Sequence, residues 1–527
     1  MEKFNQLIIK LKKELIMSFY FPLPEKVIKS KMVYDCDKCK LSENNKIHNP
    51  KMKPFIGNSY NGLVIVADSP SLEDDIKNIP LINEDAKIVR SCFLKNKVNL
   101  VNQSAITYAL CCSVKKPTDT QYRCCRDILA ERLLQLKPKV IVTLGEMAFK
   151  LVMGIKNKIG ATKIRNRVVP NFEFNCIVFP MFDPNNISVK KNYHYQFALQ
   201  KDIERISKLW IKNYSKRTYV NNLLKERKIL DNITIHDVKE HEIDLILNQM
   251  NQLKEAALDY EATNVKTHDS FFEITHISFG LKQTAWVFHE HLWENNLTVF
   301  DDKIYPFMKQ FLLNPNIKKI IQNSKFEDLA SRHIFGTNKI NNVFCTMLST
   351  HVVDERQGCT SLDFQNLMRF GIPPYSDTVK SHLVPKTKDH KVNTIRKSPY
   401  DDMILYAGLD VITTFNQYLV LHNEILPNIY DRAYENYEFL LKGHNAFANM
   451  TQRGIYISET AWDEIETKLD FEIDNILQQI SELPEFQQYN EYLKSKMINN
   501  KDGDKEIKKL IENMKNQTIE EKENDND

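Results

Sequence analysis

The sequence predicts a multidomain protein of the α/β class, and three observations lead to this prediction. The chain has 527 residues, which is more than one hydrophobic core normally organises. Apolar, strand-like runs at 63–67 and 139–144 each end in a turn, and the second leads into a helical segment at 146–152. Such units are typical of a parallel sheet covered by helices. Residues 458–493 have the apolar spacing of long amphipathic helices, so C-terminal helices follow the α/β part.

Composition and charge narrow the class of protein. A hydrophobic content of 42% and a charged content of 27% fit a soluble globular chain, and no apolar run approaches the roughly 18 residues of a membrane span. Residues 1–32 have helix-like apolar spacing and no small-residue cleavage site, so we interpret them as a helical lead rather than a signal peptide. We therefore expect a cytoplasmic protein without a membrane partner. With a net charge of +4, nucleic acid would be bound by local basic patches.

The cysteines mark the first domain, which we predict at residues 33–210. Ten cysteines in a chain without a secretion signal indicate reduced thiols or metal ligands rather than disulfides. A C-x-x-C motif joins Cys36 to Cys39, and adjacent pairs follow at 111–112 and 124–125. This clustering predicts a metal site in the first third of the chain.

The motifs of this domain resemble those of the iron–sulfur uracil-DNA glycosylases. They are the C-x-x-C-x-L that begins at Cys36, the turn Asp68–Ser71 after the first strand, and the segment Leu136–Gly145. Together they cover most of residues 36–205. The resemblance implies a parallel α/β sandwich. The sequence contains neither a phosphate-binding loop nor a dinucleotide-binding motif, so nucleotide-cofactor binding has no support.

The resemblance also implies a [4Fe–4S] cluster, because four thiolates can ligate such a cluster. The implied ligands are Cys36, Cys39, Cys112 and Cys125. The interval between the last two is short for the family, so Cys111 or Cys124 is an alternative ligand. Zinc, or no metal, is the alternative to the cluster.

The positions that carry the glycosylase chemistry differ in this chain. Leu81 stands where the family has an aromatic side chain that stacks on a flipped uracil, and Tyr108 where it has the asparagine that reads the base edge. Asp183 replaces the histidine of the second motif. Because a flipped base must be stacked and hydrogen-bonded to be held, we predict a domain that has kept the fold and lost base excision. Active uracil repair is the alternative.

In the middle third, the strand-like run Ala256–Thr263 carries Asp259 and Glu261 two residues apart. Side chains alternate along a strand, so both carboxylates point to the same side. Neighbouring carboxylates repel unless a cation lies between them, and their oxygen atoms suit Mg²⁺ or Mn²⁺. A solvated strand edge is the alternative, so the interpretation depends on whether further acids converge on this strand.

Two later segments supply such acids. Ser398 and Pro399 begin a predicted helix, in which Tyr406 and Asp410 are four residues apart and share a face. Before it, a strand at 318–322 leads into a helix that carries adjacent acids at 327 and 328. The order of strand acids, junction acids and helix tyrosine–acid pair is more specific than any one motif.

This order resembles that of the DEDD-type 3′–5′ exonucleases with a tyrosine in the third motif, and in particular the proofreading domains of family A (polymerase I-like) DNA polymerases. The resemblance covers about residues 255–425 and implies a ribonuclease H-like fold for the domain that we predict at 231–425. It implies that two ions, Mg²⁺ or Mn²⁺, promote phosphodiester hydrolysis. The implied metal ligands are Asp259, Glu261, Glu327 and Asp410, and Tyr406 completes the catalytic set by orienting the attacking water.

Some assignments within this domain stay open. Glu327 is our choice for the second motif, and Asp328 would serve if the helix were rotated by one residue. The resemblance places Asn323, Lys325 and Thr263 at the terminal nucleotide, and capping of the strand is the alternative role for Asn323 and Lys325.

The remaining segments are a linker and a C-terminal region. Residues 211–230 are basic with two tyrosines, and we interpret them as a solvated linker, with contact to DNA as the alternative. Residues 436–457 resemble the entry into a polymerase thumb, so we expect thumb-like helices at 426–495. A charged, disordered tail is expected at 496–527.

These observations predict a metal-dependent 3′–5′ exonuclease that acts on DNA 3′ ends in replication, in a phage-type protein. The palm and fingers of a family A polymerase have no room in the sequence. We therefore expect no polymerase activity from this chain and a separate polymerase polypeptide as its partner, or a truncated exon product. A non-catalytic DNA-binding subunit is the rival from another class, and the metal site does not exclude RNA as a substrate.

Overall fold

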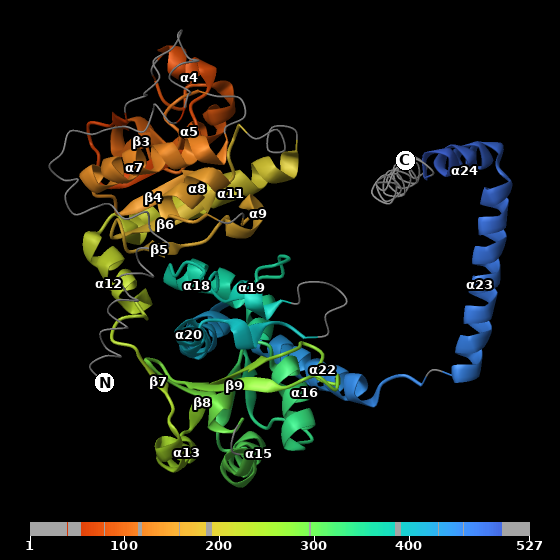
Figure 1. The fold of residues 1–527 in the computed structure, drawn as a ribbon. Coiled ribbons are helices and arrows are strands. Elements are labelled where there is room, and N and C mark those ends of the chain that lie inside the picture. The colour runs from red at the N-terminus through yellow and green to blue at the C-terminus, as the bar shows by residue number, and fades with distance from the viewer. Residues whose placement is uncertain are drawn as a thin grey trace. The chain divides into compact units, whose positions relative to one another are not determined.

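The computed structural model describes Cys39 and residues 54–77, 79–113, 118–156, 159–185, 192–294, 297–384, 392–429, 432–456 and 458–497. The predicted helical lead at 1–32 and the predicted tail beyond residue 497 lie outside these residues. The chain divides into two units, Met1–Gln452 and Arg453–Asp527, and the larger unit contains two separate six-stranded sheets (Figure 1).

The first sheet has the strand order β1-β3-β2-β4-β6-β5. Its four central strands are parallel, whereas the edge strands β1 and β5 are antiparallel to their neighbours. The strands are β1 Phe55–Ile56, β2 Leu63–Ala67, β3 Ser104–Tyr108, β4 Val140–Leu144, β5 Val169–Asn171 and β6 Cys176–Met181. The strands predicted at 63–67 and 139–144 are confirmed.

Helices cover both faces of this sheet. On one face α7 (Asp119–Leu136) and α8 (Glu146–Met153) pack against one set of strand side chains, which includes Val66, Ile141 and Val178. On the other, α5 (Glu84–Lys95) and α11 (Tyr193–Leu209) bury the opposite set. The predicted parallel α/β sandwich is therefore confirmed. Helix α12 (Arg217–Arg227), within the predicted linker, packs onto the same layer through buried apolar side chains.

The second sheet has the order β12-β11-β8-β9-β10-β7, so β8 lies near its centre. β8, β9 and β10 form an antiparallel meander, while β11 and β12 run parallel to β8. The strands are β7 Thr234–Asp237, β8 Glu255–Ala262, β9 Ile274–Gly280, β10 Thr284–His289, β11 Lys318–Ile321 and β12 Val343–Cys345. The predicted meander and the strand before residue 323 are confirmed.

Helix α20 (Tyr400–Val420) covers one face of this sheet, and α13 (Ile243–Asn251), α15 (Tyr305–Leu313) and α16 (Ser324–Phe335) cover the other (Figure 1). Helix α20 lies very close to the strand β9 beneath it. A Cβ atom added at Gly280 of β9 would come within 2.7 Å of Val411. Among the described helices α20, with its extension to Asn423, is long and apolar enough to cross a membrane, but 83% of its apolar window is buried inside the fold.

Helix α18 (Leu362–Phe370) contacts both parts of the larger unit, the first sheet with its helices and the helix α20 that covers the second sheet. Phe364, Leu367 and Met368 belong to the same apolar cluster as the α7–α8 face of the first sheet. Nearby, Arg167 forms an ion pair with Asp354, next to α17 (Thr346–Val353). The other side of α18 faces α20 through a hydrogen bond from Gln417 to Asn366, at 2.9 Å.

The last described helices of the chain are α22, α23 and α24. α22 is Ala433–Arg453, and in the smaller unit α23 is Glu459–Glu482 and α24 is Pro484–Met497. The helices predicted from residue 458 onward are confirmed.

Candidate active site

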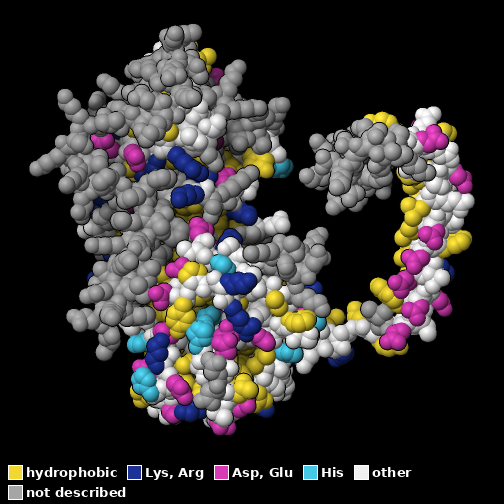
Figure 2. All heavy atoms as spheres, in the orientation of Figure 1, with side chains coloured by type: hydrophobic (Ala, Val, Ile, Leu, Met, Phe, Trp, Pro, Cys, Tyr) yellow, Lys and Arg dark blue, Asp and Glu magenta, His cyan; other side chains and the backbone are white. Residues whose placement is uncertain are grey.

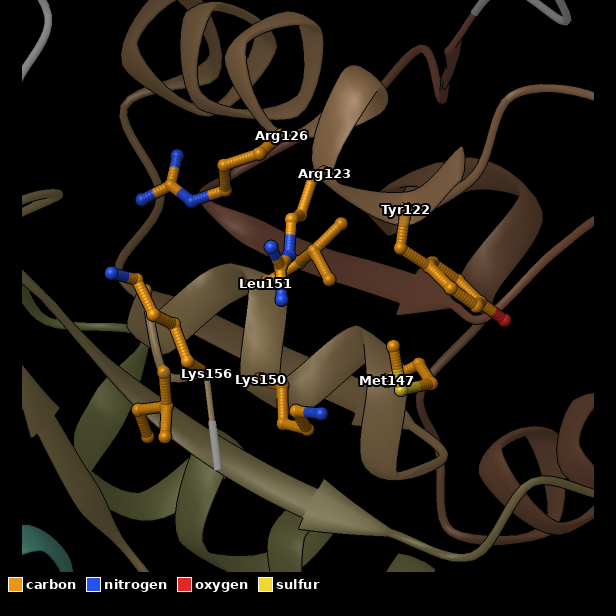
Figure 3. A pocket seen from close by; sticks show the side chains of 9 residues that line it. Tyr122, Arg123, Arg126, Met147, Lys150, Leu151 and Lys156 are labelled. Carbon is orange, nitrogen blue, oxygen red and sulfur yellow. The ribbon is translucent and has the colours of Figure 1, made fainter. Parts of the chain in front are cut away.

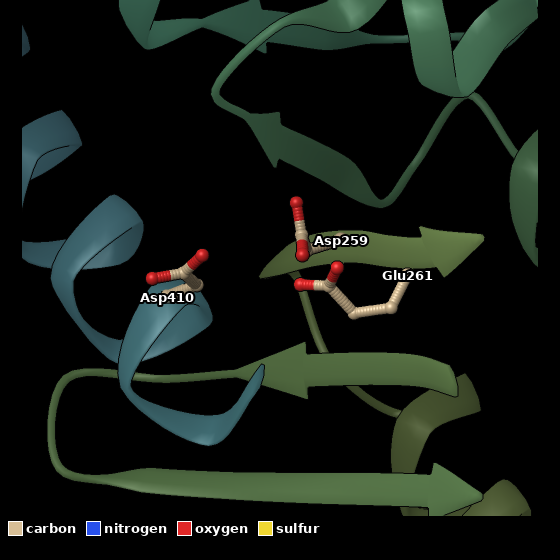
Figure 4. Close-up of side chains that lie close together, drawn as sticks. All are labelled: Asp259, Glu261 and Asp410. Carbon is tan, nitrogen blue, oxygen red and sulfur yellow. The ribbon is translucent and has the colours of Figure 1, made fainter. Parts of the chain in front are cut away.

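Asp259, Glu261 and Asp410 form the acidic centre of the second sheet. Asp259 and Glu261 lie on β8, and their side chains point to the face that α20 covers, whereas Leu258 and Tyr260 point into the opposite core. Asp410 comes from the middle of α20. One carboxylate oxygen from each of the three residues lies within 4.8 Å of the others, and Figure 4 shows the three groups pointing toward one another.

Burial and the closeness of the three carboxyl groups raise their pKa values. Burial raises the pKa of Asp259 to about 7. Burial, reinforced by the neighbouring Asp259, raises the pKa values of both Glu261 and Asp410 well above their usual range. Three acids so close together cannot all ionise at neutral pH without a counter-charge. The site therefore fits a divalent cation, for which such oxygen ligands are suited.

Asp410 is held by Tyr375, a residue that the sequence motifs do not include. The Tyr375 hydroxyl donates to Oδ1 of Asp410 and also contacts Thr413 Oγ1 at 3.2 Å. Asn366 of α18 donates to the same hydroxyl at 3.4 Å. Tyr375 is buried and follows the end of α18 by a short loop, so no helical or strand period relates it to Asp410.

Tyr406 lies one turn before Asp410 on α20, as its four-residue spacing predicts. Burial and the nearby charges of Asp410, Glu261 and Asp259 raise its pKa well above the usual range. The hydroxyl therefore stays protonated and lies in the field of all three acids, where it can donate a hydrogen bond.

Glu327 and Asp328 lie near the start of α16 and have different surroundings. Asp328 is engaged on both oxygens: Arg332 donates to Oδ2 at 2.7 Å and the Ile340 amide donates to Oδ1 at 2.9 Å. Glu327 is buried, and its Oε2 atom has no hydrogen-bond partner. Burial and then the charge of Asp259 raise the pKa of Glu327 well above its usual range. These contacts favour Glu327 as the fourth acid of the site.

A pocket of about 550 Å³ lies beside Glu261. Asn323 and Lys325, two of the predicted substrate contacts, line it together with Phe326. Thr263 lies outside this lining. Its hydroxyl is used inside the β8–β9 connection, where it donates to the Phe271 carbonyl at 2.7 Å.

In the first domain, the two positions expected to stack on and read a base, Leu81 and Tyr108, are buried in contacts within the domain. Tyr108 is almost completely buried. Its hydroxyl donates to Asp74 Oδ2 at 3.1 Å and accepts the Leu81 amide at 2.9 Å. Leu81 is also buried. Burial and the nearby Asp183 raise the pKa of Asp68 well above its usual range.

The predicted cluster ligands are only partly described. Cys36 lies outside the described residues, and Cys39, Cys112 and Cys125 are buried. A hydrogen bond with Cys111 raises the pKa of Cys125, so Cys111, the alternative ligand, is the thiol beside it. Within the described part of the chain, no three thiols bring their sulfur atoms within 4.8 Å of one another. An iron–sulfur cluster has no support from these contacts.

A second, basic hollow lies between α7 and α8 (Figure 3). Arg123, Arg126, Lys150 and Lys156 line it, and Arg126 is paired with Glu173 at 2.6 Å. Its volume of about 30 Å³ has room for little more than water, so we assign it no ligand.

Comparison with known proteins agrees with the two-domain order. A family model described as 3′-5′ exonuclease matches residues 237–426, and a model of the uracil DNA glycosylase superfamily matches residues 54–210. The predicted arrangement of a glycosylase-like domain followed by an exonuclease domain is therefore confirmed. The type-4 uracil-DNA glycosylase of Archaeoglobus fulgidus is 25% identical over 127 residues, which cover 23% of this chain. The chain spans 61% of the length of that relative.

Several solved structures are partly similar. NrnC of Brucella melitensis is 18% identical, with 40% of this chain and 90% of that chain covered and a TM-score of 0.28. The RNase D:GMP complex of Trypanosoma brucei is 14% identical, with coverage of 45% and 68% and a TM-score of 0.34. The catalytic core of RRP6 from the same organism is 13% identical, with coverage of 42% and 56% and a TM-score of 0.28.

Proposed function

We propose that the exonuclease domain of this chain is a divalent-metal-dependent 3′–5′ exonuclease that removes nucleotides from DNA 3′ ends. The observation that carries the proposal is the convergence of Asp259, Glu261 and Asp410, whose oxygen atoms lie within 4.8 Å of one another. A structural role alone does not account for it, because burying three neighbouring acids destabilises a fold that binds no cation.

The residues have complementary roles in this proposal. Asp259, Glu261 and Asp410, with Glu327 as the fourth acid, would hold two divalent ions, Mg²⁺ or Mn²⁺. When bound, these ions supply an activated water and charge neutralisation at the scissile phosphate. Tyr406, which keeps its proton, donates a hydrogen bond that orients the attacking water. Lys325 and Asn323 line the adjacent pocket, where a cation and an amide suit the phosphate and base of the terminal nucleotide.

We propose DNA as the substrate because a glycosylase-like domain precedes the exonuclease domain. The same proposal gives the chain a role in proofreading during replication, with a separate polypeptide that carries the polymerase, in the cytoplasm of a bacterial host of a phage. The filled site around Tyr108 and Leu81 supports the loss of uracil excision.

The test is digestion of 5′-labelled oligonucleotides with Mg²⁺. The substrates are single-stranded DNA, a 3′-mismatched primer–template and RNA of the same sequence. We expect shortening from the 3′ end, faster on DNA than on RNA, and loss of at least about a thousandfold in rate for Asp259→Ala. Asp302→Asn, at an exposed acid of the same domain, is the matched control and keeps full activity. Full activity of Asp259→Ala would contradict the proposal, and faster digestion of RNA would change its substrate.

A further inference from the structure

Helix α23 buries none of its 24 residues. Its exposed side chains include large apolar groups, among them Trp462 at 58%, Leu469 at 52% and Ile476 at 54% exposure. A soluble helix normally turns such side chains toward a core, and a contiguous exposed apolar face marks an interaction site.

Most of the large apolar side chains of α23 follow one line, which continues to Leu483 directly after the helix. They recur in six steps of three or four residues, and we call this set the apolar stripe: Trp462, Ile465, Leu469, Ile473, Ile476, Ile480 and Leu483. The mean step is about 3.5 residues, the period with which a helix packs along a second helix or a long groove. Phe471 lies outside the stripe, on the opposite side of the helix, because it is two residues from Leu469 and from Ile473.

An acidic row runs beside the stripe. It consists of Glu459, Asp463, Glu466, Asp470 and Asp474, again in steps of three or four residues. The whole helix has eight acids and one base, Lys468, which gives a net charge of 1 − 8 = −7. Figure 2 shows hydrophobic and acidic side chains together on the visible face of α23. Such a surface repels the phosphates of DNA and attracts an apolar surface with basic edges.

We propose that α23 is a docking helix for a second polypeptide, which presents an apolar helix or groove edged by Lys and Arg. The charge of the row selects this occupant over a second copy of the chain. Pairing two α23 helices would bury both stripes, but the helix offers only Lys468 against the acidic row, so like charges would remain along the contact. The inference uses no residue of the acidic centre on β8, so it stands whether or not the exonuclease proposal does.

The experiment uses the full chain and a labelled synthetic peptide of about four heptads, with Leu at positions a and d and Lys at e and g. Binding is followed by fluorescence anisotropy. We expect micromolar affinity that weakens with salt, and at least about tenfold weaker binding of the same peptide with Glu at e and g. Leu469→Glu in the stripe weakens binding of the basic peptide by at least about tenfold. Phe471→Glu, which adds the same charge outside the stripe, is the matched control and keeps the affinity.

Three outcomes would overturn the proposal: no binding of the basic peptide, equal binding of the acidic peptide, or equal losses in the two variants. Sedimentation equilibrium of the wild type distinguishes the remaining occupant. A dimer that Leu469→Glu converts to a monomer would show that the stripe binds a second copy, and would also overturn it. Circular dichroism of both variants checks that α23 stays helical, and digestion of single-stranded DNA checks the exonuclease domain separately.

Discussion

Tyr375 donates its hydroxyl hydrogen to Oδ1 of Asp410 across a sequence separation of 35 residues, at 2.5 Å. The bond fixes the carboxylate of the acid that α20 contributes to the site. It also connects this acid to α18, since Asn366 donates to the Tyr375 hydroxyl. A partner of this kind orients a metal ligand and adjusts its affinity for the ion.

We therefore expect Tyr375→Phe to weaken metal binding, because the phenyl ring keeps the packing and only the donor is lost. The Mn²⁺ affinity should fall roughly tenfold or more, and the Mg²⁺ concentration for half-maximal digestion should rise in parallel. Calorimetric titration with Mn²⁺ and digestion of single-stranded DNA measure the two quantities. Tyr418→Phe is the control, because Tyr418 lies on α20 and its hydroxyl donates to Glu255 of β8, outside the acidic centre. An unchanged Mn²⁺ affinity in Tyr375→Phe would contradict the positioning role.

The sequence predicted the site residues that are related by the period of a single strand or helix, and it missed Tyr375, which is not. Strand alternation was enough to place Asp259 and Glu261 on one face, and the four-residue spacing was enough for Tyr406 and Asp410, because both are properties of a single element. Tyr375 reaches the site through the loop after α18 and has no periodic relation to any motif. A buried tyrosine in such a loop has no signal in one sequence.

The choice between Glu327 and Asp328 shows a second limit of the sequence. The junction between a strand and a helix predicted that an acid would face the site, but not by how much the helix is rotated. That rotation is set by tertiary contacts, here by the engagement of Asp328 with Arg332 and with the Ile340 amide. Likewise, the spacing of the cysteines did not show that Cys111 lies beside Cys125, since this depends on how α7 packs against the segment that follows β3.

Substitutions of the two adjacent acids of α16 should have different effects: that of Glu327 should lower activity, and that of Asp328 should lower stability. Glu327→Gln removes a buried carboxyl whose Oε2 has no partner, so we expect a loss of at least about a hundredfold in digestion rate and no loss of thermal stability. Asp328→Asn breaks the buried ion pair with Arg332, so we expect a destabilisation of about 3 kcal/mol.

The two variants are compared by thermal unfolding without metal and by digestion at a temperature where both are folded. If Asp328→Asn were the inactive, stable variant and Glu327→Gln the unstable one, the second-motif assignment would be reversed.

The acidic centre also predicts how stability changes with pH when no metal is present. The folded-state pKa of Asp259 is about 7, above its value of about 4 in an unfolded chain. The protonated carboxyl thus contributes stability that is complete below pH of about 4 and is lost as the pH rises through about 7. Asp259→Asn lacks this titration. We therefore expect the variant to gain on the wild type by roughly 2–3 kcal/mol between pH 5 and pH 8.

Thermal unfolding of both proteins in a chelating buffer measures this gain, and Mg²⁺ at pH 8 should reverse it by binding the wild type more tightly. A constant difference between the two proteins from pH 5 to pH 8 would show that Asp259 does not titrate in this range.

Two glycines test how closely α20 must approach the sheet. A Cβ atom at Gly280 would meet the backbone carbon and the side chain of Val411 at 2.7 Å, one residue from Asp410, so Gly280→Ala must push α20 away from β9. We expect a destabilisation of about 2–3 kcal/mol and weaker Mn²⁺ binding, because Asp410 moves with the helix while Asp259 and Glu261 stay on β8.

Gly443→Ala is the matched control: it lies within helix α22 with nothing within 4 Å of the new Cβ atom, and should stabilise the chain by about 0.5–1 kcal/mol. Chemical unfolding and Mn²⁺ titration of the two variants measure both effects, and full Mn²⁺ affinity in a destabilised Gly280→Ala protein would show that the acids on β8 bind the ion without help from α20.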